Sequence, residues 1–186
     1  MDVTETSLPG VKLLSPPRFA DPRGFFAEIF NRRTLLEVGV TTEFVQENHS
    51  YSKKSGTLRG LHFQGPPAAQ TKLLRVLTGA ILDICVDLRQ GSPTFGRHEM
   101  IELSAESGRQ VLCPKGFAHG TLTLEPHTEI AYKVDAYYAP ELEFGLHFDD
   151  PDLAIDWPMP VDDMILSKKD RDQPRLCDLP PIFTFS

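Results

Sequence analysis

The stretch LLRVLTGAILDICVDL, residues 73–88, contains two β-prone runs that meet near Gly79. In the second run, polar or small residues alternate with apolar ones, Ile81, Asp83, Cys85 and Asp87 against Leu82, Ile84, Val86 and Leu88. This period of two predicts a strand whose apolar face covers a core. The other face either packs against neighbouring strands or lines a pocket, because a small barrel can leave room for one ligand.

The rest of the chain continues this pattern of short strands. Its 13 glycines and 16 prolines separate most of the β-prone runs, which is typical of antiparallel sandwiches and barrels. Besides residues 72–78 and 79–88, strands are expected at Phe25–Phe30, Thr42–Ser50, Gly56–Phe63, Arg97–Leu103, Gln110–Cys113, Gly120–Leu124, Thr128–Val134 and Glu143–Phe148. We therefore predict a mainly β fold.

Helix is the minor element in this prediction. The best helical segment is Asn31–Gly39, which ends at a glycine able to adopt a left-handed cap. The tail after Asp149 is dense in Asp and Pro, so we expect it to be irregular and to wrap the sheet core. Short helical turns are predicted there near Asp152–Ile155 and Ser167–Asp172.

Length and charge bound the class of protein. The 186 residues suit one domain over 1–186, with an irregular C-terminal tail from about residue 150. No apolar run approaches the roughly 18 residues of a membrane span, and MDVTETSLPG does not resemble a secretion signal, so a cytoplasmic location is expected. The net charge of −7 argues against nonspecific nucleic-acid binding. An anionic ligand must therefore meet a local basic cluster.

The three cysteines do not indicate a disulfide scaffold or a metal cluster. Cys85, Cys113 and Cys177 are odd in number and lack CxxC spacing, which argues against both a disulfide scaffold and a zinc cluster. Cys85 and Cys113 lie in apolar runs and are expected in the core.

Candidate chemistry gathers around RGLHFQ at residues 59–64. His62 follows Arg59 and precedes Lys72, and Gly60 allows close backbone approach. A strand histidine is commonly a hydrogen-bonded structural residue. Nearby cations favour a second interpretation, in which a neutral imidazole acts as a base beside positive charge for a phosphate or an enolate oxygen. Tyr132 likewise has two interpretations, as a buried core residue or as a catalytic acid.

The segment PKGFAHG at residues 114–120 resembles the second motif of the cupin superfamily, PxGxxH, and that resemblance implies a jelly roll. The first cupin motif carries HxH and a downstream Glu as metal ligands, whereas GLHFQ around His62 offers one histidine. His49, His62 and His119 could still be imagined as a three-nitrogen site, but a ligand of the usual set is missing.

Together the motifs resemble the dTDP-4-dehydrorhamnose 3,5-epimerase family, a branch of the cupins. They run in order from about residue 10 to 175 and comprise FADPRGFFAE (19–28), QENHS (46–50), LRGLHFQ (58–64), Lys72, VDLR (86–89), SPTFG (92–96), PKGFAHG (114–120), YK (132–133), IDWP (155–158) and LSKKD (166–170). The resemblance implies a metal-free, cofactor-independent isomerase with a cupin-type antiparallel jelly roll and short peripheral helices. It also implies a homodimer in which N-terminal residues reach the neighbouring subunit's site.

By the same resemblance the substrate is dTDP-4-keto-6-deoxyglucose, converted to dTDP-4-keto-L-rhamnose on the way to L-rhamnose. His62 would be the base, Asp170 its hydrogen-bond partner, Tyr132 the acid on the opposite face, and Lys72 the group that stabilises the oxyanion. Substrate contacts would come from Arg23, Phe26, Glu28, Gln46, Glu47, Asn48, Arg59, His119, Glu143 and Lys169.

Two departures from the family pattern leave alternatives open. Thr121 follows Gly120 where an aromatic is more common, and PPAAQ at residues 66–70 lies in a loop of variable length before Lys72. A C3-only or C5-only epimerase of a related keto sugar, a non-catalytic sugar-nucleotide-binding cupin and a metal-dependent cupin enzyme are the competing interpretations. The retained trio of His62, Tyr132 and Asp170 favours the double epimerase.

Overall fold

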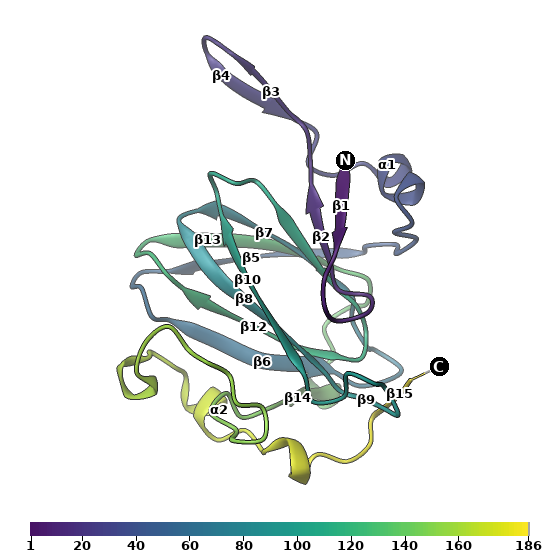
Figure 1. Cartoon of the computed structure of the whole chain (residues 1–186), viewed down its shortest axis with the longest axis vertical. Coiled ribbons are helices and arrows are strands. Elements are labelled where there is room, and N and C mark those ends of the chain that lie inside the picture. The colour runs from purple at the N-terminus through teal and green to yellow at the C-terminus, as the bar shows by residue number, and fades with distance from the viewer. Residues whose placement is uncertain (186) are drawn as a thin grey trace.

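A computed structural model describes residues 1–185, and two antiparallel sheets dominate it (Figure 1). The six-stranded sheet has the order β1 (Asp2–Glu5), β2 (Lys12–Ser15), β11 (Gln110–Cys113), β7 (Lys72–Thr78), β13 (Thr128–Val134) and β5 (Gln46–Ser52). The five-stranded sheet has the order β10 (His98–Ser104), β8 (Ala80–Asp87), β12 (Phe117–Thr123), β6 (Leu58–Gln64) and β14 (Glu143–Gly145). The predicted mainly β, jelly-roll class is confirmed.

The remaining elements lie at the periphery. A hairpin of β3 (Arg18–Asp21) and β4 (Gly24–Ala27) projects away from the two sheets (Figure 1). Near the C-terminus, β15 (Phe183–Thr184) pairs in parallel with β9 (Arg89–Gln90). The helices are short: α1 (Arg32–Glu37), α2 (Lys168–Arg171) and the single 3₁₀ turns η1 (Pro140–Leu142), η2 (Val161–Asp163) and η3 (Leu176–Asp178).

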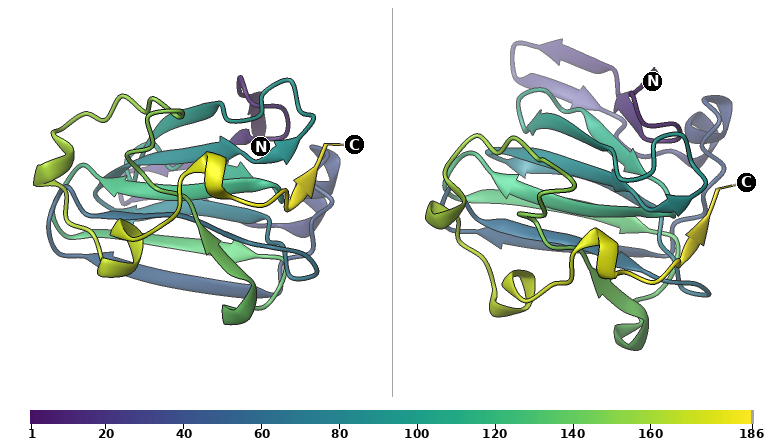
Figure 2. Two further views of the ribbon diagram at one scale, coloured as in Figure 1. Left: turned by 90° about the horizontal axis from the view of Figure 1, so that it is seen from below. Right: turned by 60° about the horizontal axis from the view of Figure 1, so that its bottom comes forward.

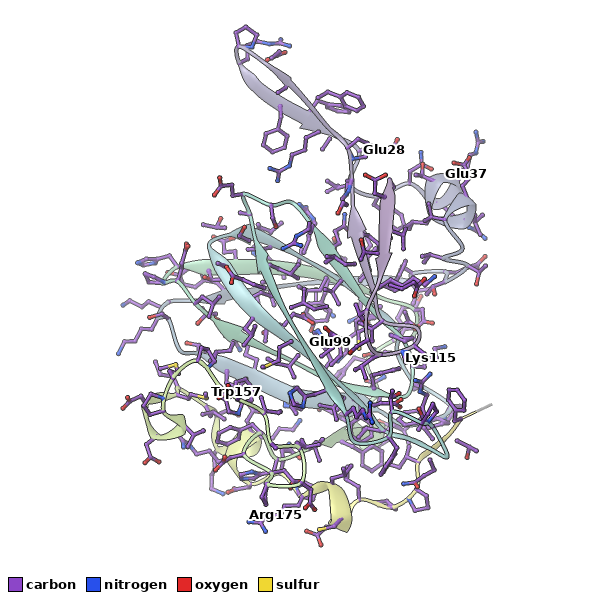
Figure 3. The ribbon with its side chains drawn as sticks, in the orientation of Figure 1. Glu28, Glu37, Glu99, Lys115, Trp157 and Arg175 are labelled. Carbon is purple, nitrogen blue, oxygen red and sulfur yellow. The ribbon has the colours of Figure 1, made fainter. Side chains whose placement is uncertain are left out.

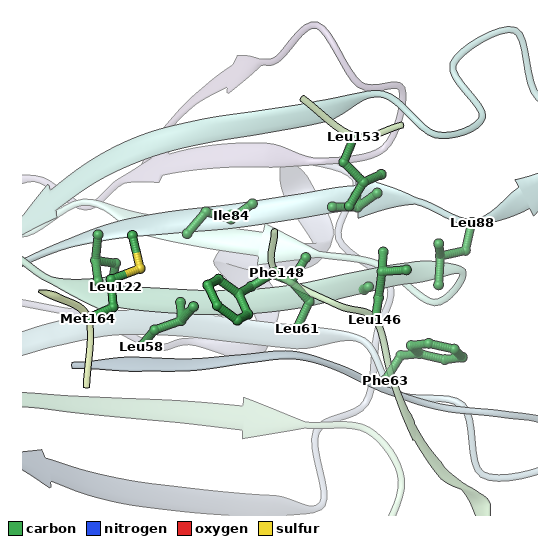
Figure 4. Packing of buried hydrophobic residues seen from close by; sticks show 12 residues of the cluster. Leu58, Leu61, Phe63, Ile84, Leu88, Leu122, Leu146, Phe148, Leu153 and Met164 are labelled. Carbon is green, nitrogen blue, oxygen red and sulfur yellow. The ribbon is translucent and has the colours of Figure 1, made fainter. Parts of the chain in front are cut away.

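Both faces of β8 are buried, and each packs against a different layer. Ile81 and Cys85 point into the space between the sheets, where they join residues of β7 and β11. Ile84 and Val86 point outward and pack under the C-terminal tail, in a cluster that includes Phe148 (Figure 4). The predicted alternation therefore holds. The apolar outer face is covered because the tail runs across the five-stranded sheet (Figure 2).

A smaller cluster covers the outer side of the six-stranded sheet. Leu35 of α1 packs with Leu14, Leu73 and Leu112. The helix begins where the Asn31 side chain accepts a hydrogen bond from the Arg33 N–H at 2.9 Å, which satisfies one of its free donors.

Most expected elements were located correctly, and the exceptions have physical reasons. The helical turn expected near Asp152–Ile155 is a single turn, in which the Asp150 carbonyl accepts from the Leu153 and Ala154 N–H groups. It does not continue as a helix, because Ala154 has a φ of +47°. Strands β1, β2, β3, β9 and β15 were not predicted, since each has two to four residues, too few for a clear period. None of the helices in residues 1–185 has the length and apolar character to span a bilayer.

Candidate active site

A cavity of about 310 Å³ opens between the two sheets. Its lining comes from both sheets and from the C-terminal tail, and comprises Ser50, Arg59, His62, Lys72, Leu74, His119, Thr121, Ile130, Tyr132, Ser167, Lys169 and Asp170. A second hollow of about 240 Å³ adjoins it and shares His62, Lys72 and Tyr132 with it. These three shared residues form the junction of one larger site.

His62 on β6 forms a tight pair with Asp170 on α2. Its Nε2 lies 2.5 Å from Oδ1 of Asp170, and only 6 % of the aspartate side chain is exposed. The short helix is held by Ser167, whose Oγ accepts the Asp170 N–H at 3.1 Å. Burial acts to raise the pKa of Asp170, but the hydrogen bond to His62 and its charge outweigh it, so the pKa lies below its ordinary value. The carboxylate therefore stays ionised beside the imidazole.

Gly60 sets the spacing beneath this pair. A Cβ on Gly60 would lie 2.6 Å from Cα of Gly120 on β12, and the residue has a φ of +136°, so a side chain is excluded. The close approach brings His62 directly opposite His119 in the β6–β12 register. The predicted close backbone approach at Gly60 is confirmed.

Lys72 reaches the cavity from the other sheet. It begins β7, opposite Cys113 of β11 and Val134 of β13, and its Nζ donates to the backbone carbonyl of His62 at 3.2 Å. Burial lowers the pKa of Lys72, because water that would solvate the ammonium is excluded. Its Nζ is thus a hydrogen-bond donor on the cavity wall.

Tyr132 lies on β13 of the six-stranded sheet, whereas His62 lies on the five-stranded sheet. Burial raises the pKa of the Tyr132 phenol, partly offset by a hydrogen bond from the Asn48 side chain and by the charge of Arg59. The phenol therefore keeps its proton at neutral pH and can donate it. An imidazole and a phenol thus meet the cavity from different sheets.

The second hollow ends in a charged network. Glu143 of β14 accepts hydrogen bonds from Lys169 Nζ at 2.5 Å and from the Tyr138 hydroxyl at 2.7 Å. Burial acts to raise the pKa of Glu143, but these two donors lower it overall. Gln46 and Asn48 line the same hollow and are joined by a side-chain hydrogen bond of 2.8 Å.

Several cavity residues were not predicted from the sequence. They include Ser50, Leu74, Tyr138 and Ser167. Ser50 was signalled by the alternation of β5, which puts it on the face of Asn48. Tyr138 carried no such signal, because it follows the strand in an irregular segment.

Four predicted substrate-binding residues lie outside the cavity of this chain. Arg23 and Phe26 are exposed on the projecting hairpin, where Arg23 pairs with Asp21, and Glu28 follows at its base (Figure 3). Glu47 lies on the face of β5 opposite to Gln46 and Asn48, and it pairs with Lys133. Their role in substrate binding stays a prediction.

The three histidines considered as a metal site have separate carboxylate partners. His49 pairs with Glu129, His62 with Asp170, and His119 with Asp83. Within residues 1–185, one of these histidines, His119, does come together with two other potential ligands, Asp83 and Cys85, and the three ligand atoms lie within 4.8 Å of one another. In this group Asp83 already accepts a hydrogen bond from His119 at 2.8 Å.

Residues 5–178 match the family model described as dTDP-4-dehydrorhamnose 3,5-epimerase. The chain belongs to this family. The resemblance inferred from the motifs is confirmed, and the protein is an epimerase, an isomerase of the dTDP-rhamnose pathway.

Relatives with known names agree over nearly the full length of this epimerase. A dTDP-4-dehydrorhamnose 3,5-epimerase of Sinorhizobium fredii is 47 % identical over 183 residues, which cover 96 % of this chain and 91 % of that protein. The Bacillus anthracis enzyme, crystallised with TDP and pyrophosphate, is 52 % identical with a TM-score of 0.91, covering 94 % of this chain and 98 % of that one. The Legionella pneumophila enzyme, in complex with dTDP-4-keto-L-rhamnose, is 41 % identical with a TM-score of 0.94, covering 100 % and 98 %.

Proposed function

We propose that this epimerase inverts both C3 and C5 of dTDP-4-keto-6-deoxyglucose, with His62 as base and Tyr132 as acid. The observation that carries the proposal is that the two groups face one cavity from different sheets, with the Lys72 ammonium beside them. A ring held between them presents one face to the imidazole and the other to the phenol.

The proton transfers balance without a second substrate. C3 and C5 each flank the C4 ketone, so removal of either proton by His62 places the electron pair largely on the C4 oxygen as an enolate. Lys72 stabilises that oxyanion, where one preorganised donor is worth about 100-fold or more in rate. Tyr132 then protonates the same carbon from the other face, and solvent restores both residues. Asp170 orients the His62 ring and stabilises the imidazolium.

The polar end of the site suits a nucleotide. Arg59 lines the first cavity with its guanidinium bonded to the Tyr51 carbonyl at 3.1 Å, which aims a fixed positive charge at a diphosphate. Gln46 and Asn48 supply amide donors and acceptors for a base, and the half-exposed ring of Tyr138 offers a flat surface for stacking. Glu143, Lys169 and His119 complete the contacts.

The projecting hairpin supports a homodimer. It carries exposed Phe19, Phe25 and Phe26 beside Arg23, apolar surface that monomers rarely leave uncovered. Inserted into the cavity of a second copy, it would bring an arginine to the diphosphate and a phenylalanine to the nucleoside, with Glu28 behind them.

The three cysteines are free thiols, which supports a cytoplasmic location.

The test is incubation with dTDP-4-keto-6-deoxyglucose in deuterated water, followed by NMR at C3 and C5. Deuterium and inversion at both carbons are expected. Label at one carbon alone would identify a mono-epimerase, and label at neither would refute the epimerisation of this substrate.

A further inference from the structure

Thr121 is a cavity residue that the proposed mechanism leaves unused, and it is one of the two departures from the family pattern. It lies on β12, only 4 % of it is exposed, and it lines the first cavity between the sheets. The alternation of β12 agrees, because Ala118 and Leu122 belong to the cluster under the C-terminal tail on the other face. The side chain of Thr121 therefore points toward the space where a ligand binds.

The Thr121 hydroxyl has no partner within the protein. Among residues 1–185 it makes no hydrogen bond, yet no side-chain oxygen or nitrogen of this part of the chain is both sealed from solvent and unpaired. The Thr121 oxygen must therefore open onto the cavity. Thr123, on the same face, shows the contrast, because its hydroxyl donates to the Lys54 carbonyl at 2.9 Å. A ligand that fills the cavity without bonding the Thr121 hydroxyl would leave a buried polar group unsatisfied, which is unfavourable.

The strand register places Thr121 at one end of the site. Thr121 lies opposite Arg59 in the β6–β12 register, and His119 lies opposite His62. Lys72 lies toward the other end: its Nζ donates to the His62 carbonyl at 3.2 Å, and it also lines the second hollow, whose lining includes neither Arg59 nor Thr121. His62 therefore has Lys72 on one side and the pair of Arg59 and Thr121 on the other.

A sugar nucleotide matches this order of groups. Under the proposed function the C4 oxygen meets Lys72 and the diphosphate meets Arg59. C1 carries the diphosphate and lies across the ring from C4, so it points toward Arg59 and Thr121. Its neighbour C2 bears a hydroxyl at this same end. C3 and C5 invert, so their substituents change face, whereas the C2 hydroxyl keeps its configuration and can hold one contact through the whole reaction.

We propose that Thr121 is a specificity-determining residue: its hydroxyl bonds the C2 hydroxyl of the sugar, so that the site selects 2-hydroxy sugars over their 2-deoxy analogues. The proposal rests on the proposed function, because Lys72 and Arg59 set the orientation of the ring. Each of the two hydroxyls can donate or accept, so the bond forms with the proton on either side. Thr121 moves no proton to or from carbon and acts on the choice of substrate.

The first test compares dTDP-4-keto-6-deoxyglucose with its 2-deoxy analogue in the parent and in Thr121→Val, which keeps the shape of the side chain. The variant should lower kcat/KM about tenfold for the 2-hydroxy substrate and leave it nearly unchanged for the analogue. The intrinsic effect of the missing substrate hydroxyl on reactivity occurs in both proteins and cancels in this comparison. An equal loss with both substrates would overturn the proposal.

Thr123→Val is the matched control. It removes a buried hydroxyl from the same strand and face, but one that is bonded within the protein. The ratio of kcat/KM for the two substrates should stay at the parent value in this variant. A ratio that falls as far as in Thr121→Val would mean that the strand, and not a contact from Thr121, sets the preference, and would overturn the proposal.

The second test needs no turnover. Because dTDP-glucose and dTDP-2-deoxyglucose have no ketone, calorimetry measures their binding alone. The parent should bind dTDP-glucose about tenfold more tightly, and Thr121→Val should lose this preference. Equal affinity of the parent for the two would overturn the proposal without any variant. Absence of deuterium incorporation together with an intact binding preference would refute the proposed reaction and support the contact, whereas label at both carbons without a preference would do the reverse.

Discussion

Nε2 of His62 lies 2.5 Å from Oδ1 of Asp170, although 108 residues separate the two along the chain. The pairing depends on the C-terminal tail, which crosses the outer face of the five-stranded sheet and brings α2 to the cavity rim (Figure 2). The tail therefore supplies the partner of the proposed base and also covers a hydrophobic layer.

Substitution of either partner should remove most of the turnover. His62→Ala deletes the base, and Asp170→Asn leaves an amide that cannot stabilise the imidazolium, so each should lower kcat roughly 100-fold or more. Substrate affinity should change little for Asp170→Asn, because the amide keeps the shape of the side chain. Steady-state kinetics checks both, and near-normal kcat in either variant would contradict the dyad.

Tyr132→Phe should separate exchange from inversion. The base and the oxyanion donor are retained, so deuterium from solvent should still enter at the carbon that His62 deprotonates. Inversion should fall more strongly, because no acid remains on the other sheet. NMR measures both rates in one sample. An equal loss of the two rates would argue against Tyr132 as the opposite-face acid.

The parts of the fold that the sequence predicts are those with a clear period. Strand β8 alternates over eight residues, and both of its faces behave as the pattern requires. Strand β1 has only four residues, of which three are exposed, so no burial pattern marks it. Pairing of distant strands, and hence the position of one sheet relative to the other, has no counterpart in local sequence.

The site was predictable to the same extent. Residue type and strand alternation nominate His62, Lys72 and Tyr132. Asp170 could be assigned only through family resemblance, because its spacing from His62 carries no information. The sequence predicted only part of the network around Glu143. It missed Tyr138, because the position of that residue depends on the course of an irregular segment.

Asp87 should make stability depend on acid pH. Its carboxylate accepts hydrogen bonds from Arg89, Ser92 and Thr94, which outweigh the opposing effect of burial and lower its pKa from 3.8 to about 2. Because the folded pKa is the lower one, the stabilisation is fully present above pH 3.8 and is lost as pH falls toward about 2. At neutral pH it amounts to roughly 2 kcal/mol.

The corresponding variant is Asp87→Asn. Its free energy of unfolding in urea should be lower than that of the parent by roughly 2 kcal/mol at pH 7, and the gap should narrow at acid pH. Asp162→Asn, at an exposed position of η2, is the control and should change little. A gap for Asp87→Asn that stays constant with pH would show that the ionised form is not the stabilising one.

The proposed dimer predicts that two inactive variants can restore activity to each other when they are mixed. If Arg23 serves the site of a second subunit, Arg23→Ala and His62→Ala each abolish most activity but damage different halves of a shared site. Random exchange of subunits in an equal mixture puts half of the dimers in the mixed form, and each mixed dimer has one intact site, so roughly a quarter of the parent activity should return. Assays of the mixture against each variant alone measure this. Variants that stay inactive when mixed, although mass spectrometry detects mixed dimers, would mean that Arg23 acts within its own chain or not at all.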